Sequence, residues 1–245
     1  MSTRIGLDIA DGVAWITLDG PGQRNALDAE SAAALIEVCE RVDADEAVGA
    51  TVITGADPAF CSGADRAHLA QLRTAAPDAV YEGLDAVYVA FRRFGELSMP
   101  TVAAVNGAAV GAGVNLALAA DLRVLADTAV LASGFAGIGL HPGGGHLNLL
   151  ARAGGPALAA AMGVFAQPVG AERAVATGLA WTAVPPEELR DTVTGLVTHL
   201  AADPPLARAL AASLHRTAFD TAGWDRAVEV ERARQMWSLP RRGSR

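Results

Sequence analysis

The side chains best suited to move a proton at neutral pH include a histidine one helical turn beyond an acid. His68 follows Asp65 by three residues, where a helix would place both side chains on one face. An unperturbed imidazole titrates close to neutrality, so His68 is the first candidate for an acid or base, with Asp65 and Cys61 as further candidates. The alternative is that His68 is an ordinary surface histidine.

A second pair of histidines flanks a glycine-rich turn. His141 and His146 stand on either side of Pro142-Gly-Gly-Gly145. His146 could carry a proton, or it could cap or pack at the start of a helix predicted over residues 147–153. The pair lacks a third ligand nearby, so no metal site is predicted.

Very small residues gather at two places, Gly63-Ala64 and Gly111-Ala112-Gly113. Without bulky side chains, the backbone there can approach a ligand closely. Backbone N–H groups at the start of a helix could then stabilise an oxygen atom that gains negative charge. The alternative is that residues 111–113 form only a tight turn between a strand and a helix.

Lysine is absent from the chain, because all 19 basic residues are arginine. This excludes a phosphate-binding loop of the Walker type, a Schiff-base lysine and a lysine anchor for pyridoxal phosphate. A Gly-x-Ser-x-Gly nucleophile motif is also missing.

The composition indicates a folded α/β protein. Of the 245 residues, 51% are hydrophobic and 19% are charged, which is enough apolar material for a continuous core. The net charge of −8 gives no general attraction to nucleic acid or to anionic lipid, so neither is a predicted partner. The N-terminus does not resemble a signal peptide and the two cysteines form no framework, so we expect a cytoplasmic protein with reduced thiols.

The hydrophobic patterns predict alternating strands and helices. We expect strands over residues 12–18, 47–54, 101–105, 122–125 and 130–133, a loop over residues 56–65, and helices over residues 28–43, 77–97 and 114–120. The charge-free stretch over residues 97–120 is long enough to cross a membrane, but proline, glycine and asparagine interrupt it, so no membrane span is predicted. Phe91, Phe94, Phe135, Phe165 and Trp181 are expected in the core by default, although any of them could line a pocket.

The last quarter of the chain has a different pattern. Three successive helices are predicted over residues 187–202, 204–218 and 224–237, followed by a frayed tail over residues 240–245. We therefore expect a core over residues 1–184 and a helical subdomain over residues 185–245.

Four sequence blocks, in order and at matching spacing, resemble the enoyl-CoA hydratase/isomerase (crotonase) superfamily. They are Gln23-Arg-Asn-Ala-Leu27, Phe60-Cys-Ser-Gly-Ala-Asp65, Pro100-Thr-Val-Ala-Ala-Val-Asn-Gly-Ala-Ala-Val-Gly-Ala-Gly-Val114 and Gly139-Leu-His-Pro-Gly-Gly-Gly145. Glycine-rich turns are common, so one block alone would be a weak signal. Together the blocks cover roughly residues 9–184.

The resemblance implies a fold, an assembly and a ligand. The fold would be a spiral of repeated ββα units with a trailing helical subdomain, usually assembled as homotrimers or homohexamers. The ligand would be an acyl-CoA, with coenzyme A entering as part of the substrate and no permanently bound cofactor. The thioester carbonyl would lie between the backbone N–H groups of Ala64 and Ala112.

The resemblance also implies which residues meet the ligand. Coenzyme A would contact Arg24, Ala26, Ser62, Ala64, Asp65 and Arg66. Guanidinium groups suit phosphate oxygens, so Arg24 and Arg66 are the candidates for the phosphates, although either could be a solvated surface charge. His141 and Gly143 would lie in the acyl pocket.

Hydratases of this superfamily use two glutamates, and the corresponding positions here hold Asn115 and Phe135. No acidic residue occurs between Glu96 and Asp121 or between Asp127 and Glu172, so a shifted alignment does not recover either one. An amide cannot take a proton from water, and a phenyl ring can only exclude water. We therefore expect ordinary hydration to be impaired.

Two main interpretations remain. The chain could be a lyase or isomerase that polarises an acyl-CoA thioester and uses a residue other than a carboxylate, such as His68, as acid or base. Alternatively, it could bind or carry acyl-CoA without turnover. A purely structural role is less favoured, because the Ala64 and Ala112 segments are retained.

Overall fold

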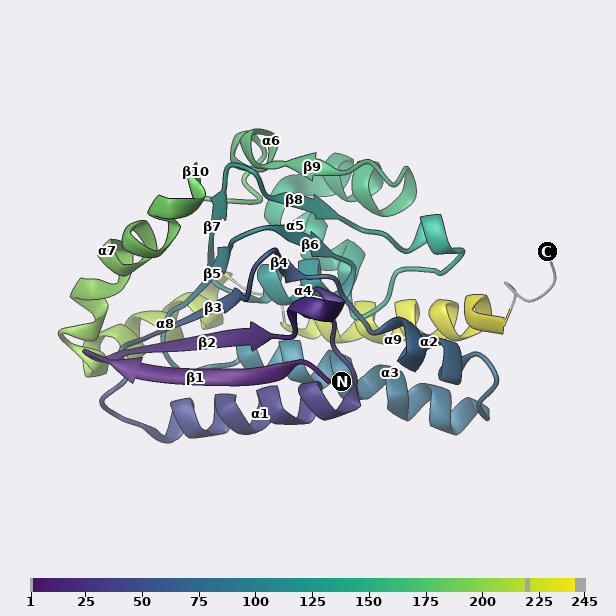
Figure 1. The fold of residues 1–245 in the computed structure, drawn as a ribbon, viewed down its shortest axis with the longest axis horizontal. Coiled ribbons are helices and arrows are strands. Elements are labelled where there is room, and N and C mark those ends of the chain that lie inside the picture. Colours follow the sequence, from purple (N-terminus) through teal and green to yellow (C-terminus); the bar gives the residue numbers. More distant parts are fainter. Residues whose placement is uncertain (1, 219–220, 241–245) are drawn as a thin grey trace.

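The computed structural model describes residues 2–218 and 221–240, and its strands form two sheets (Figure 1). The six-stranded sheet has the order β1-β2-β3-β5-β7-β10 and the four-stranded sheet has the order β4-β6-β8-β9. The strands are β1 (Arg4–Ala10), β2 (Val13–Asp19), β3 (Ala50–Gly55), β4 (Ala59–Cys61), β5 (Thr101–Val105), β6 (Ala108–Val110), β7 (Leu122–Ala126), β8 (Val130–Ala132), β9 (Val169–Gly170) and β10 (Thr182–Val184).

From β3 to β8, successive strands alternate between the large and the small sheet. β3, β5 and β7 pair side by side in parallel in the large sheet, while β4, β6 and β8 do the same in the small one. Each pair is followed by one or more helices, so the chain advances as a spiral of ββα units. Strands covered on both sides should be continuously apolar, and all five residues of β5 are indeed buried.

Helices cover both sheets. They are α1 (Ala29–Ala44), α2 (Arg66–Leu72), α3 (Pro77–Gly95), α4 (Ala112–Ala119), α5 (His146–Ala159), α6 (Ala171–Ala176), α7 (Leu189–Ala201), α8 (Pro204–Ala218) and α9 (Thr221–Ser238), with short turns η1 (Pro21–Gln23), η2 (Ala136–Ile138), η3 (Ala160–Val164) and η4 (Pro186–Glu188). Asp28 caps α1 as predicted, because its side chain accepts a hydrogen bond from the Ser31 N–H at 2.9 Å. None of the helices in the described part of the chain is both long and apolar enough to span a membrane.

The three helices predicted at the end of the chain are present as α7, α8 and α9. In α7, Leu189, Val193 and Val197 are buried, and this helix contacts strands of the large sheet. In contrast, α9 lies against α3 and α5. Residues 241–245, the greater part of the expected tail, lie outside the described residues.

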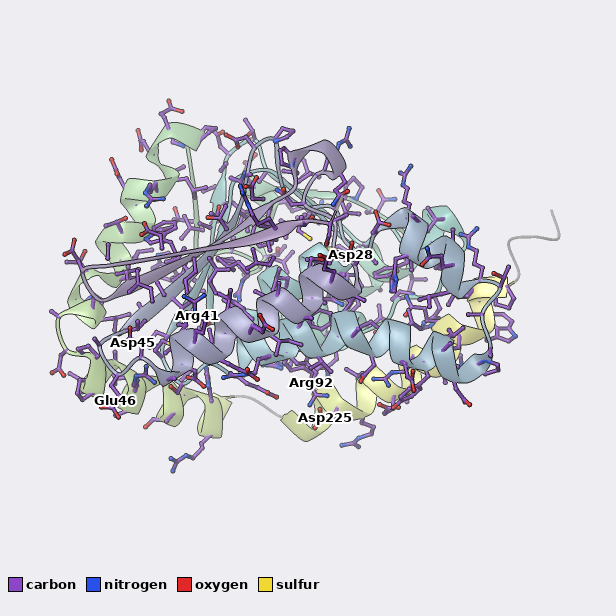
Figure 2. All side chains as sticks on the ribbon, turned by 60° about the horizontal axis from the view of Figure 1, so that its bottom comes forward. Asp28, Arg41, Asp45, Glu46, Arg92 and Asp225 are labelled. Atoms are coloured by element: carbon purple, nitrogen blue, oxygen red, sulfur yellow. The ribbon has the colours of Figure 1, made fainter. Side chains whose placement is uncertain are left out.

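Two ion pairs fix α9 to α3. Figure 2 shows Arg92 of α3 beside Asp225 of α9, with 2.8 Å between the guanidinium and carboxylate atoms. Further along, Arg232 reaches Asp85 at 2.6 Å and lies over the ring of Tyr81. The Arg232 side chain is almost fully buried, so this second contact holds the helix more firmly than an exposed pair would.

Three sequence-based expectations were wrong. Residues 56–65 are not only a loop, because β4 pairs with β6 within them. Phe165 and Trp181 are not in the core, since they are 70% and 65% exposed. Phe165 follows η3 and Trp181 precedes the short β10, and neither belongs to the hydrophobic core cluster.

The side chain of Asn25 links the first sequence block, residues 23–27, to the turn that leads into β4. Its Nδ2 donates to the carbonyls of Ala56 and Ala59, each at 2.7 Å, and its Oδ1 accepts from the Gly20 N–H at 2.9 Å. Asn25 is fully buried and has a positive φ of 58°, a conformation that asparagine tolerates better than most residues. This hydrogen-bonded clamp positions the loop that precedes α1.

We expect Asn25→Ala to lower the free energy of unfolding by about 3 kcal/mol, because it removes the amide that donates to the carbonyls of Ala56 and Ala59 and accepts from the Gly20 N–H. Urea denaturation would measure the change. Asp11→Ala is the matched control, since Asp11 also has a positive φ, of 50°, but is exposed. A loss for Asn25→Ala no larger than that of the control would show that backbone conformation alone matters at this site.

Candidate active site

One cavity of about 550 Å³ opens among the segments that the sequence singled out. It lies where β4, β6 and β8 end, beside α3 and α9. Most of the predicted site residues line it, namely Arg24, Ala26, Ser62, Ala64, Asp65, Arg66, His68, Ala112, Asn115, Phe135 and Gly143. His141 is not among the residues that line this cavity; its ring Nδ1 lies 2.7 Å from the Pro142 carbonyl oxygen.

The N–H of Ala64 points toward this cavity. The neighbouring backbone groups are engaged with Leu27, because Gly63 accepts from the Leu27 N–H at 2.8 Å and Asp65 donates to the Leu27 carbonyl at 2.7 Å. Backbone groups of adjacent residues in an extended strand point in opposite directions. The N–H of Ala64 therefore faces away from Leu27, on the side that lines the cavity.

The N–H of Ala112 belongs to the first turn of α4. N–H groups in the first turn of a helix lack an acceptor within the helix, and the helix dipole makes them favourable sites for negative charge. α4 begins two residues earlier than the sequence predicted, so its first N–H groups stand directly at the cavity. A Cβ added to Gly63 would lie 3.3 Å from the Ala112 nitrogen, which shows how closely the two segments approach.

Asp65 and His68 have structural contacts in addition to their place at the cavity. The Asp65 carboxylate caps α2 and accepts from the N–H groups of Ala67 and His68 at 2.8 and 3.0 Å. The His68 Nε2 lies 3.0 Å from the Gly83 carbonyl oxygen, to which only a protonated nitrogen can donate. In the neutral ring Nδ1 is then left as an acceptor. Asp65 is thus committed to helix capping, whereas His68 keeps one free ring nitrogen.

A chain of three buried polar side chains lies at the inner end of the cavity. The Ser133 Oγ is 2.6 Å from His146 Nε2, and His146 Nδ1 is 2.7 Å from Asn115 Oδ1. Asn115 also donates from Nδ2 to the Gly143 carbonyl at 3.0 Å. Burial lowers the pKa of the fully buried His146 to about 3, so its ring is neutral at physiological pH.

The start of α5 is held by an acid from α9. The Glu231 carboxylate accepts from the N–H groups of His146 and Leu147, at 2.7 and 3.0 Å. Burial raises the pKa of Glu231 to about 7, and these hydrogen bonds act in the opposite direction. The ring of Phe135 packs edge-on against the His146 ring, with 5.0 Å between their centres.

Apolar side chains and one polar pair complete the wall. Leu84 and Val87 of α3 and Leu140 face the cavity, together with Tyr88. The Tyr88 hydroxyl donates to the side chain of Gln235 on α9. Cys61, a further candidate in the sequence, is fully buried, and burial raises the pKa of its thiol to about 12, so it is not a reactive thiolate.

Comparison with known proteins identifies the family. The model of the family described as enoyl-CoA hydratase/isomerase matches residues 8–238, nearly the whole chain. The chain belongs to the enoyl-CoA hydratase/isomerase family. The expected crotonase fold is therefore confirmed, with two sheets and trailing helices.

Individual relatives agree with this assignment. A Mycobacterium tuberculosis H37Rv protein described as probable enoyl-CoA hydratase EchA14 is 44% identical over 174 residues, which cover 71% of this chain and 67% of that protein. The 1,2-epoxyphenylacetyl-CoA isomerase of Escherichia coli K12 is 33% identical over 197 residues, covering 80% and 75% of the two chains. A crystal structure of an enoyl-CoA hydratase/isomerase from Xanthobacter autotrophicus Py2 superposes with a TM-score of 0.90 at 28% identity, covering 100% of this chain and 91% of that one.

Three residues at or beside this site were missed in the sequence-based prediction. Ser133, Glu231 and Gln235 carry no motif, and the last two come from a helix that is distant in sequence. The only signal for Ser133 was its place as the last residue of the strand predicted over residues 130–133. Within the described residues, no group of three or more potential ligand side chains could hold a metal ion.

Glu231 and His146 should affect stability in opposite ways as the pH changes. Glu231 ionises near pH 4.5 in the unfolded chain but near 7 when folded, so its contribution to stability is lost as the pH rises between these values. His146 binds a proton near pH 6.5 when unfolded but only near 3 when folded, so its contribution is lost as the pH falls between these values.

We therefore expect the stability of Glu231→Gln, relative to the parent protein, to increase between pH 5 and 7, by an amount on the order of 2 kcal/mol. Urea denaturation at several pH values would measure it. Glu229→Gln on the same helix is the control for loss of a carboxylate, because the Glu229 side chain is 60% exposed. A pH-independent difference for Glu231→Gln would contradict the assignment.

Proposed function

We propose that the protein binds an acyl-CoA in the 550 Å³ cavity and polarises its thioester through the backbone N–H groups of Ala64 and Ala112. The observation that carries this proposal is the meeting of both N–H groups at one cavity. Preorganised donors of this kind stabilise an oxygen that gains charge and are worth about 3 kcal/mol each in comparable sites. The enolate or tetrahedral oxyanion of a thioester has such an oxygen.

Charge at the mouth of the cavity supports coenzyme A as the carrier group. Arg24 and Arg66 are both exposed, and both line the cavity. They are well placed for phosphate oxygens, which the guanidinium group binds through two donors. The net charge of −8 means that this local pair, and not the whole surface, would attract the ligand.

The proposed reaction is not ordinary hydration. At the two positions where the hydratases of the family carry glutamates, Asn115 is fully occupied by His146 and Gly143, and Phe135 packs against His146. Neither side chain can take a proton from water. One relative, the Escherichia coli isomerase, is named for a reaction other than hydration, so the family scaffold serves different chemistry.

Ala112→Pro tests the oxyanion donors directly. Proline is tolerated at the first position of a helix, but it lacks the N–H and would place a carbon in its direction. We expect turnover of acyl-CoA substrates to fall by about 10²-fold or more. Ala29→Pro, at the first position of α1 and exposed, is the matched control and should leave turnover unchanged.

The same preparations would be offered crotonyl-CoA, with loss of the conjugated-enoyl absorbance as the readout. We expect binding without efficient hydration. Rapid hydration would refute the argument from Asn115 and Phe135. Equal turnover by Ala112→Pro and the parent would refute the oxyanion site.

We further propose His68 as the group that carries the α-proton of the bound thioester. His68 is the predicted site histidine that lines the cavity, and the contact of its Nε2 with the Gly83 carbonyl leaves Nδ1 as an acceptor. We expect His68→Ala to slow exchange of the α-protons of hexanoyl-CoA into D2O by about 10²-fold, measured by mass spectrometry. His199→Ala, exposed on α7, is the control; unchanged exchange in His68→Ala would exclude this role.

We also propose self-association as trimers or paired trimers, as the family resemblance implies. Phe165 and Trp181 expose large apolar surfaces that are rarely left open to water in quantity. Light scattering of the purified protein would measure the assembly directly.

A further inference from the structure

We propose that Ser133, His146 and Asn115 form a nucleophilic relay through which the protein transfers the acyl group of a thioester to Ser133 and then to water. This inference goes beyond the proposed polarisation of the thioester and rests on it, because the relay needs the same bound acyl-CoA. The reaction class is thioester hydrolysis by way of an acyl-serine.

The hydrogen bonds determine where each proton lies. The Gly143 carbonyl can only accept, so it fixes the Asn115 amide with Nδ2 toward Gly143 and Oδ1 toward His146. The His146 Nδ1 must then carry the hydrogen. Its Nε2 is therefore unprotonated and accepts the hydroxyl hydrogen of Ser133 at 2.6 Å.

This is the arrangement that activates a serine. The nucleophile lies within hydrogen-bonding distance of a base, and a third group orients the base, the relation that defines serine and cysteine triads on unrelated folds. Asn115 is the positioning residue, as asparagine is in the cysteine triads. The Asn115 contact directs the lone pair of His146 Nε2 toward the Ser133 hydroxyl before any substrate arrives.

Ser133 also lies next to the proposed oxyanion donors. It directly follows β8, whose last residue Ala132 pairs with Val110, and the Gly111 N–H donates to the Ala132 carbonyl at 2.9 Å. Ala112 is the next residue along. Ser133, Ala64 and Ala112 all line the same cavity, so a carbonyl held by the two N–H groups would have a serine hydroxyl at the wall beside it.

The proposed step conserves atoms and charge. The Ser133 Oγ attacks the thioester carbon while its proton moves to His146 Nε2, and the carbonyl oxygen becomes an oxyanion at the N–H groups of Ala64 and Ala112. The carbon–sulfur bond then breaks, and the thiolate of coenzyme A takes the proton from Nε2. Water attacks the acyl-serine in the same way, which releases a carboxylic acid and restores the hydroxyl.

The first experiment uses hexanoyl-CoA and the full-length protein. Release of coenzyme A would be followed with a thiol reagent, for which Cys39 and Cys61 are too deeply buried to give a background. Rapid acid quenching and peptide mass spectrometry would locate a hexanoyl group. We expect thiol release, a hexanoyl adduct on the peptide that contains Ser133, and incorporation of one ¹⁸O atom from labelled water into hexanoate.

Variants separate the relay from a packing role. We expect Ser133→Ala and His146→Gln to lower the rate of thiol release by at least about 10²-fold. Asn115→Leu should lower kcat while leaving the affinity for hexyl-CoA, the thioether analogue, unchanged. Ser213→Ala, on the exposed side of α8, is the matched control for loss of a serine hydroxyl. Because Ser133→Ala removes only one oxygen, it is expected to fold, and circular dichroism would verify this.

The thioether analogue keeps this inference separable from the proposed function. Binding of hexyl-CoA by calorimetry, without an adduct or thiol release above the level of Ser133→Ala, would overturn the relay and leave acyl-CoA binding intact. Failure to bind the analogue would overturn both proposals. Thiol release that persists in Ser133→Ala would show hydrolysis by another group and would also refute the relay.

Discussion

The site depends on the close approach of two backbone segments, the turn after β4 and the turn after β6. A Cβ on Gly63 would lie 2.5 Å from the Val110 carbonyl oxygen, so no side chain fits there without displacing the backbone. Gly63 also has a φ of 92°, which only glycine adopts readily. This contact brings Ala64 and Ala112 to one cavity. The parallel pairing of β4 with β6 places both turns at the same edge of the small sheet.

The side chains that surround these two backbone segments determine the chemistry of the site. The inner wall of the cavity holds Ser133, His146 and Asn115, which are joined by hydrogen bonds and carry no net charge. Each of these side chains has a hydrogen-bond partner within the protein. Burying such a network costs little only if it is complete, because an unpaired buried donor or acceptor is penalised by about 1–3 kcal/mol. A buried carboxylate at the position of Asn115 would require further donors or a raised pKa, as Glu231 shows. The amide at position 115 therefore lowers the free-energy cost of holding the site together.

Much of this arrangement could be predicted from the sequence, because it depends on signals between residues that are close together in the chain. Periodicity and capping identified α1, α3 and the three last helices. Two of the motif blocks contain Ala64 and Ala112, and the family resemblance assigned the two glutamate positions to Asn115 and Phe135; all four residues line the cavity. Short strands were less visible, since the three residues of β4 are too few to show a period. Ser133 was missed because a lone serine has no signature; only folding places it 2.6 Å from His146. The exposure of Phe165 and Trp181 was missed because hydrophobicity does not report whether a neighbour exists.

The site residues that α9 supplies could not be predicted from any local sequence pattern. Glu231 and His146 are 85 residues apart, yet the carboxylate supplies the acceptors that the first N–H groups of α5 need. The pairing of Arg232 with Asp85 fixes the register of α9, and this register decides that Glu231 faces α5 while Gln235 faces the cavity. Helix α9 thus contributes Gln235 to the cavity wall and also binds the backbone of His146, whose ring lies beside the Ser133 hydroxyl. The cavity wall and the first turn of α5 therefore both depend on where α9 lies, through Gln235 in one case and Glu231 in the other.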